Sequence, residues 1–178
     1  MSMQRLKPDE LRTTVRDEEK YKKIKRNPIY IILDNVMDTY NTGAIFRLAD
    51  AVAAEKVILC GETEVPPNTR IKKASINTTE WVAWLYEADA KTAILNLKSK
   101  IPSLQIIAIE QDSRSIPFQK ADYSLPVALV VGHETHGISE EVLEICDQIV
   151  ELPMYGINTS LNVMVSLGIV LYEVIKYT

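Results

Sequence analysis

Three polar, glycine-containing segments carry most of the residues in this sequence that could do chemistry. They are residues 35–47 (NVMDTYNTGAIFR), 132–139 (GHETHGIS) and 152–162 (LPMYGINTSLN). In an open α/β sheet, ligands bind beyond the carboxyl ends of the strands, and these segments occupy such positions. They hold four of the six glycines, Gly43, Gly132, Gly137 and Gly156. A glycine there indicates either a simple turn or a close approach to a ligand, so we expect the segments to converge on one binding site.

Familiar nucleotide and metal motifs are incomplete in these segments. No G-x-G-x-x-G follows the first apolar run, which argues against a dinucleotide-binding fold. Gly132 and Gly137 have the spacing of a phosphate-binding loop, but Ile138-Ser139 stands where Lys-Ser/Thr is required. His133 and His136 are three residues apart in an expected loop, so we predict no metal site.

The elements that must position these segments alternate between strand and helix from Pro28 onward. Apolar runs predict strands at residues 29–33, 57–60, 105–109, 127–131 and 148–152. Helical periodicity is expected after Asn41, over residues 91–98, after Ser139 and from about Ser160, and these Asn and Ser residues are favoured helix N-caps. The alternation predicts an α/β fold with a mostly parallel sheet flanked by helices.

Composition narrows the class of protein. The 178 residues are 47% hydrophobic and 25% charged, as in ordinary globular proteins. No apolar run approaches the roughly 20 residues that span a bilayer, and no secretory signal precedes the first strand. We therefore expect a cytoplasmic protein without a membrane partner, in which Cys60 and Cys146 are buried thiols.

The net charge of −4 is unevenly distributed. Residues 1–27 hold nine basic and five acidic residues, a net of +4, which leaves −8 for the remainder. A basic arm on an acidic body is typical of nucleic-acid-binding proteins, although charges that merely solvate a helix would give the same pattern. We place a boundary at Asn27-Pro28, between a helical arm (1–27) and a single domain (28–178). Candidate nucleic-acid contacts in the arm are Lys22, Lys23, Lys25 and Arg26.

Three motifs, in order, make the sequence resemble a known family. N-x-G-A-x-x-R spans Asn41 to Arg47, G-x-E-x-x-G-[IL]-S spans Gly132 to Ser139, and [IL]-P-M…S-L-N joins residues 152–154 to residues 160–162. Together they are similar to the motifs of the SpoU (TrmH-like) branch of the SPOUT superfamily, whose members are S-adenosylmethionine-dependent RNA ribose 2′-O-methyltransferases. The resemblance runs from about Ile29 to the C-terminus and does not cover the arm.

The resemblance implies a fold, a cofactor and partners. The fold would be a SPOUT α/β-knot, in which the C-terminal segment threads a loop to form a deep trefoil knot. S-adenosylmethionine would be held largely by backbone groups, and the implied cofactor-binding residues are Gly132, Leu152, Met154, Ser160 and Leu161. The partners would be RNA, with tRNA favoured over rRNA because the chain is compact, and a second copy of the chain, since both subunits contribute to each site.

The resemblance also implies catalytic roles. Arg47 would be the residue that assists proton removal from the ribose hydroxyl. Because a guanidinium is not deprotonated in water, we interpret Arg47 as a bidentate anchor for the adjacent phosphate, with that phosphate or a perturbed Arg47 accepting the proton. Asn41, Glu134, Ser160 and Asn162 would form the supporting shell. Four of these residues have a structural alternative: an ion pair with Asp50 for Arg47, helix caps for Asn41 and Ser160, and a solvated loop acid for Glu134.

Two alternatives remain for the whole protein. One is a catalytically idle RNA-binding relative, which the retained Arg47, Glu134, Ser160 and Asn162 disfavour. The other is an α/β enzyme with a different nucleotide-like ligand. His133, Thr135 and His136 stand where the family commonly has small or amide residues, so the second motif is where this chain departs from the pattern.

Overall fold

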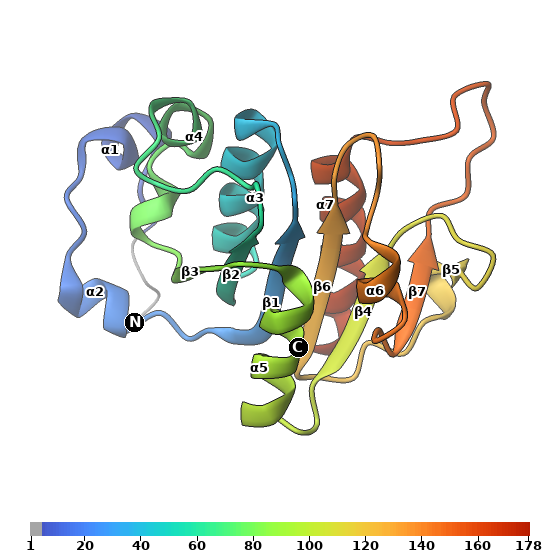
Figure 1. The fold of residues 1–178 in the computed structure, drawn as a ribbon. Helices are drawn as coiled ribbons and strands as arrows, with labels where there is room; N and C mark the ends of the chain where they lie inside the picture. The colour runs from blue at the N-terminus through green and yellow to red at the C-terminus, as the bar shows by residue number, and fades with distance from the viewer. Residues whose placement is uncertain (1–4) are drawn as a thin grey trace.

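The computed structural model describes residues 5–178 and contains one seven-stranded sheet. The strands are β1 (Asn27–Asp34), β2 (Ala54–Cys60), β3 (Trp84–Glu87), β4 (Gln105–Ile109), β5 (Ile116–Pro117), β6 (Val127–Gly132) and β7 (Gln148–Glu151). Their order is β3-β2-β1-β6-β4-β7-β5, and every pairing is parallel (Figure 1). The carboxyl ends of β1, β4, β6 and β7 therefore open at the same edge of the sheet.

Helices cover both faces of this sheet. They are α1 (Pro8–Thr13), α2 (Glu18–Lys22), α3 (Thr39–Ala51), α4 (Thr69–Ser75), α5 (Ala90–Lys100), α6 (Glu140–Leu143) and α7 (Val163–Val174), with short 3₁₀ turns η1 (Thr78–Glu80), η2 (Phe118–Lys120) and η3 (Ile175–Tyr177). α3 and α7 pack on one face, and α5 and α6 on the other (Figure 1). The predicted α/β class with a parallel, helix-flanked sheet is confirmed.

The central strands are apolar throughout because both of their faces are covered. In β1, Ile31 and Leu33 enter the core under α3 and α7, whereas Ile32 enters the core under α5. β6 alternates in the same way and all six of its residues are buried. Complete burial of such an aliphatic side chain contributes about 1.5–3 kcal/mol, so the two cores fix the sheet that carries the site.

Helix starts differ from the sequence prediction at two motif residues. α3 begins at Thr39 and is capped by Asp38, whose carboxylate accepts a hydrogen bond from Tyr40 N, so Asn41 is not the N-cap. α7 begins at Val163 and is capped by Asn162, not by Ser160. In both cases a better-placed Asx residue takes the cap, which leaves Asn41 free for other contacts. Ser139 does precede α6, but its hydroxyl donates to Asp34 and not into the helix.

The arm preceding β1 is held against the body by a few polar contacts. The Asn77 amide donates to the carbonyls of Leu11 and Thr14 at 3.2 Å each, and Arg16 donates to the Glu80 carbonyl at 3.3 Å. The described part of the arm is helical over α1 and α2, while the division at residues 27 and 28 stays a prediction. None of the helices in residues 5–178 is long and apolar enough to cross a bilayer.

Candidate functional site

A cavity of about 490 Å³ lies beyond the carboxyl ends of β4, β6 and β7. Three loops line it: the residues after β4, the loop after β6, and the long segment between β7 and α7. The sequence-predicted residues that line the cavity are Gly132, Glu134, Leu152, Met154, Ser160, Leu161 and Asn162. The second and third motifs thus converge, as expected, on one hollow.

The loop after β6 is closed by a tight backbone turn. His133 and Gly137 exchange two backbone hydrogen bonds, of 3.0 and 2.8 Å. A Cβ on Gly132 would lie 2.3 Å from the carbonyl carbon of Gly137, and Gly137 itself has a φ of +69°. Gly132 is therefore required by the close approach of the Gly137 backbone, and Gly137 by its left-handed backbone conformation.

The two histidines of this loop stabilise the turn. His133 Nδ1 accepts hydrogen bonds from the backbone N–H groups of Thr135 (2.9 Å) and His136 (3.3 Å), and the two imidazole rings lie 4.6 Å apart. Within residues 5–178 no group of three or more His, Cys, Asp or Glu side chains could hold a metal ion. His133 acts here as a turn-capping residue.

A chain of hydrogen bonds joins the three motifs. Asn162 Nδ2 donates to Asn41 Oδ1 at 3.0 Å, and Asn41 Nδ2 donates to Glu134 Oε1 at 2.9 Å. Asn162 Oδ1 meanwhile accepts from the backbone N–H groups at the start of α7. Residues that are 121 and 93 positions apart in sequence are therefore linked side chain to side chain.

The Glu134 carboxylate also fixes the start of α3. Its oxygens accept hydrogen bonds from the backbone N–H groups of Met37 (3.1 Å) and Asp38 (3.0 Å). Burial raises the pKa of the Glu134 carboxyl, but the hydrogen bonds from Asn41, Asp38 and Met37 outweigh it and hold the pKa below its usual value. Glu134 is therefore an ionised structural bridge and not a merely solvated loop acid.

Two acidic residues of the site escaped the sequence analysis. Glu110, directly after β4, accepts from Ile138 N at 2.9 Å, and a Cβ on Gly137 would lie 2.3 Å from its carboxylate. Asp34, the buried last residue of β1, accepts from the backbone N–H and the hydroxyl of Ser139 at 3.0 Å each. Both follow predicted apolar runs, so the position of a polar residue at a strand end could have identified them.

The charged side chains that line the cavity are acidic. Glu110, Glu134 and Glu151 line it, and among its described lining residues there is no Lys or Arg. Apolar walls are supplied by Ile109, Val131, Val150 and Val163. The cavity therefore suits an apolar ring joined to a positively charged group.

Arg47 lies outside this cavity within a single chain. It is exposed on α3, and within residues 5–178 no ion pair with Asp50 or another acid is present. The helical ion pair considered as its structural alternative is thus not formed. Gly43, one turn earlier, makes room for α4, since a Cβ there would lie 2.6 Å from Ala74 Cβ.

The predicted arm residues differ in their surroundings. Arg26 is half-buried, donates to the Trp81 carbonyl and stacks over Tyr21 at 5.3 Å. Lys22 lies 3.5 Å from Glu19, whereas Lys23 and Lys25 are exposed.

Both cysteines are free thiols, and burial raises the pKa of Cys60 above its usual range and that of Cys146 to about 12.

Comparison with known proteins places this geometry in a family. The model of the SpoU rRNA Methylase family matches residues 28–172. The chain is 35% identical over 155 residues to the tRNA (guanosine(18)-2′-O)-methyltransferase of Aquifex aeolicus, covering 84% of this chain and 69% of the relative. It is 31% identical over 153 residues to a 23S rRNA (guanosine-2′-O-)-methyltransferase of Ralstonia nicotianae, covering 86% and 60%.

Solved structures give the same result. The A. aeolicus TrmH/SpoU tRNA modifying enzyme superposes with a TM-score of 0.78 at 30% identity, covering 90% of this chain and 83% of that one. An AdoMet-bound rRNA methyltransferase from Sinorhizobium meliloti also gives 0.78, at 28% identity, covering 98% and 62%. The chain spans between 59% and 75% of the length of the curated relatives it matches. With its three motif segments linked at one edge of a parallel sheet, the chain belongs to the SpoU rRNA methylase family.

Proposed function

We propose that this protein methylates a ribose 2′-hydroxyl of tRNA or rRNA with S-adenosylmethionine as the methyl donor. The observation that carries the proposal is the hydrogen-bond chain from Asn162 through Asn41 to Glu134, which unites the three motif segments beside an acidic cavity. Relatives named as tRNA and rRNA 2′-O-methyltransferases support it. We favour tRNA as the substrate, and we expect the protein to act in the cytoplasm, where these RNAs are found.

The cavity fits S-adenosylmethionine in size and charge. Its volume lies within the roughly 300–1,000 Å³ of small-molecule sites. The cofactor combines an adenine with a sulfonium and an ammonium, and the cavity combines apolar walls with three glutamates. Backbone groups near Gly132, Leu152 and Leu161, together with Met154 and Ser160, would hold it. The bound cofactor supplies an electrophilic methyl group.

The chain's own residues would position and activate the nucleophile. A ribose hydroxyl is a poor nucleophile at neutral pH, so the site must align it and accept its proton. Arg47, as a charged guanidinium, can bind the neighbouring phosphate with two parallel hydrogen bonds. Because a guanidinium is not deprotonated in water, we assign proton acceptance to the phosphate oxygen that Arg47 holds. Asn41, Glu134 and Asn162 fix the segments around the cavity.

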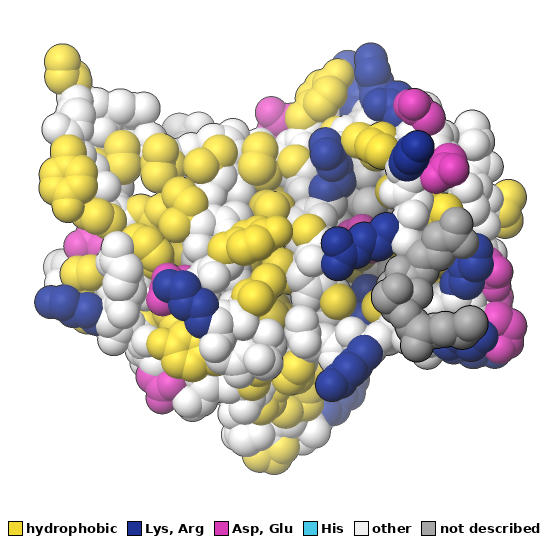
Figure 2. Space-filling model, turned by 180° about the vertical axis from the view of Figure 1, so that it is seen from behind, with side chains coloured by type: hydrophobic (Ala, Val, Ile, Leu, Met, Phe, Trp, Pro, Cys, Tyr) yellow, Lys and Arg dark blue, Asp and Glu magenta, His cyan; other side chains and the backbone are white. Residues whose placement is uncertain are grey.

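Two finer features belong to the same proposal. We propose that the segment between β7 and α7 threads a loop as the family's trefoil knot, and that the protein is a homodimer. The dimer is supported by an apolar stripe on and next to α7, where Leu161, Val165, Ile169 and Tyr172 are each 39–57% exposed. Figure 2 displays hydrophobic side chains over this face. A partner against the stripe would bring its own Arg47 helix near the interface, since Gly168 of α7 packs on Leu48 of α3.

The decisive experiment combines cofactor binding with nucleoside analysis. Calorimetry of the purified protein is expected to detect S-adenosylmethionine, and mass spectrometry of tRNA treated with protein and cofactor is expected to find a 2′-O-methylated nucleoside. Arg47→Ala should abolish methylation while cofactor affinity stays within a few-fold. Cofactor binding without any methylation of tRNA or rRNA would favour the catalytically idle relative, and no binding at millimolar cofactor would reject the proposal in favour of an unrelated ligand.

A further inference from the structure

A short basic helix stands next to the helix of the first motif. α4 has the sequence TRIKKAS, with three basic residues and no acid. Arg70, Lys72 and Lys73 are exposed, while Ile71 and Ser75 face the protein interior. In the part of the chain that the structure describes, none of the three basic side chains forms an ion pair. α4 is therefore an uncompensated positive surface on an acidic protein.

The packing of α4 relates this charge to Arg47. Gly43 of α3 approaches α4 so closely that a Cβ would lie 2.6 Å from Ala74 Cβ and 2.7 Å from the Ile71 carbonyl oxygen. Gly43 and Arg47 are four residues apart, so they share one face of α3. The rigid contact at Gly43 thus sets the basic side chains of α4 beside the helix face from which Arg47 emerges.

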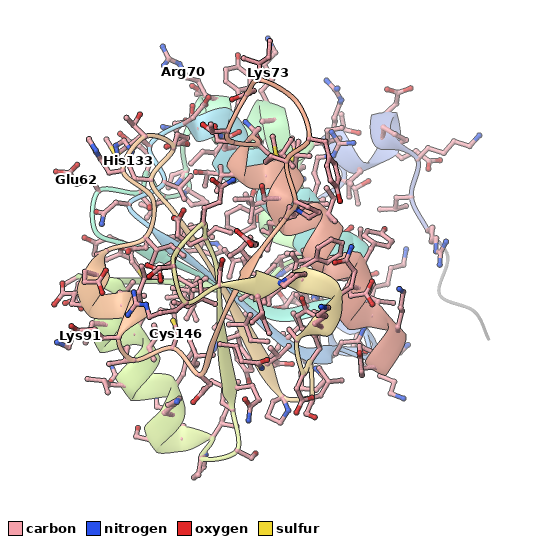
Figure 3. All side chains as sticks on the ribbon, turned by 90° about the vertical axis from the view of Figure 1, so that its right-hand side faces the viewer. Glu62, Arg70, Lys73, Lys91, His133 and Cys146 are labelled. Atoms are coloured by element: carbon pink, nitrogen blue, oxygen red, sulfur yellow. The ribbon has the colours of Figure 1, made fainter. Side chains whose placement is uncertain are left out.

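The basic residues of α4 also lie at the open end of the sheet. Figure 3 shows Arg70 and Lys73 extending from the same end of the molecule as His133, which lines the cavity. Figure 2 shows the molecule from behind. On this side, Lys and Arg side chains gather over the half that carries α3, α4 and the arm. Positive charge thus lies at the same end of the molecule as the acidic cavity, but outside the cavity lining.

Part of the arm's positive charge is engaged in contacts within the protein, unlike that of α4. Arg16 pairs with Glu18, Lys22 lies near Glu19, and Arg26 is held by Trp81 and Tyr21. α1 and α2 also carry acidic residues in their first turns. α4 differs from α1 and α2 in carrying three basic residues in seven positions with no acid among them.

We propose that Arg70 and Lys73, continued by Arg47, form a phosphate-binding surface that holds the RNA strand next to its target nucleotide. The inference rests on the proposed function and extends it to residues outside the three motifs. Phosphates are repelled by the glutamates of the cavity and attracted by α4, so the strand is held along the basic surface while only the reacting sugar approaches the cavity. Lys72, on the flank of α4, adds to the same field.

The test is the salt dependence of RNA binding by Arg70→Gln/Lys73→Gln. Fluorescence anisotropy with labelled bulk tRNA at several KCl concentrations measures the slope of log K against log[salt]. Losing two phosphate contacts should reduce the magnitude of the slope by about 1.4 for single-stranded and about 1.8 for duplex RNA, which is a loss of about 25- to 60-fold in affinity at 0.1 M salt. The KM for tRNA should rise by a similar factor, with kcat within two-fold.

The control carries the same change of charge elsewhere. Lys100 ends α5 and Lys120 lies beside the β5 edge of the sheet, and both are exposed. Lys100→Gln/Lys120→Gln should leave the slope unchanged, and calorimetry should give the same cofactor affinity for both double variants. An α4 variant with the wild-type slope, or a control with an equal loss, would overturn the proposal. Failure of the wild-type protein to bind S-adenosylmethionine would instead reject the proposed function, which the slope does not test.

Discussion

The bridge made by Glu134 can be tested by changing one atom. Glu134→Gln keeps the size of the side chain and removes its charge. If the amide oxygen keeps the position of Oε1, it still accepts from Asn41 and Asp38, but the new NH₂ group then faces the backbone N–H of Met37. The bond from Met37 is lost because two donors then face each other. The bonds from Asn41 and Asp38 remain but are weaker, since their acceptor is no longer charged.

The cost follows from these three bonds. A hydrogen bond to a charged group contributes about 1.5–3 kcal/mol when buried, and Glu134 is exposed enough for water to offset part of that loss. We expect Glu134→Gln to lower the free energy of unfolding by about 1–2 kcal/mol at pH 7. Urea denaturation measures it, with an unchanged m-value as evidence that the folded state is otherwise intact.

The pH dependence supplies an independent check. Because the folded-state pKa of Glu134 is lowered, its stabilisation is present above its ordinary pKa of 4.5 and is lost as the pH falls through the lower folded-state value. The difference between wild type and Glu134→Gln should therefore shrink below pH 4.5. Glu144→Gln, at an exposed residue of the same charge, is the control and should change stability by less than about 0.5 kcal/mol. Equal effects of the two variants, or a difference independent of pH, would refute the assigned bridge.

Three further perturbations address the cavity wall, the dimer and the arm. Gly132→Ala should weaken cofactor binding at least ten-fold by calorimetry, because the added Cβ would lie 2.3 Å from the Gly137 backbone. Gly156→Ala is the control and should leave cofactor binding unchanged, because no atom lies within 4 Å of its added Cβ. Ile169→Asp should convert the expected dimer to a monomer in analytical ultracentrifugation, since it places a charge in the exposed apolar stripe; an unchanged sedimentation coefficient would exclude that interface. Charge reversal in the arm should weaken RNA binding and flatten its salt dependence; the residues changed are Lys22, Lys23, Lys25 and Arg26. An unchanged salt slope would exclude the arm from RNA binding.

Sequence patterns identified the strands well because burial on both faces leaves a continuous apolar run. β4 has the predicted bounds, β1 extends the predicted run by two residues at its start and one at its end, and β6 extends its run by one residue. The short elements α4 and β3 were missed, since neither seven mostly polar residues nor four at a sheet edge produce a clear period. Tertiary contacts define them: α4 exists where Gly43 lets it pack against α3.

The sequence predicted which residues make up the site better than it predicted their hydrogen-bond partners. The motif pattern selected Asn41, Glu134 and Asn162, which do come together. Local propensity assigned Asn41 to a helix cap, and the alternative for Glu134 was a solvated loop acid, whereas the two bond to each other and Glu134 also accepts from backbone N–H groups. Such partners lie more than 90 residues apart, and local propensities contain no information on that distance.

The hydrogen-bond chain has a direction, and the direction explains why two asparagines and one carboxylate are used. The Asn41 amide offers one acceptor, which takes the Asn162 N–H, and one donor, which serves Glu134. Asn162 must both donate to Asn41 and accept from the start of α7, which an ionised carboxylate cannot do. Asn162→Asp retains the helix cap and even complements the helix dipole. The variant nevertheless places a carboxylate on each side of the Asn41 amide, Asp at position 162 and Glu134. The one NH₂ group of Asn41 can donate to only one of these carboxylates at this geometry.

Asn162→Asp should therefore lower stability or cofactor affinity by about 1–3 kcal/mol, the cost of an unsatisfied buried polar group. Its matched variant is Asn162→Ser, which also caps α7 but adds no second carboxylate beside Asn41. If the hydrogen-bond chain is what joins the segment between β7 and α7 to the first motif, Asn162→Asp is the more damaging change although aspartate is the better cap. The opposite ranking would mean that Asn162 acts only as the start of α7, and that the three motif segments are held together by the sheet alone.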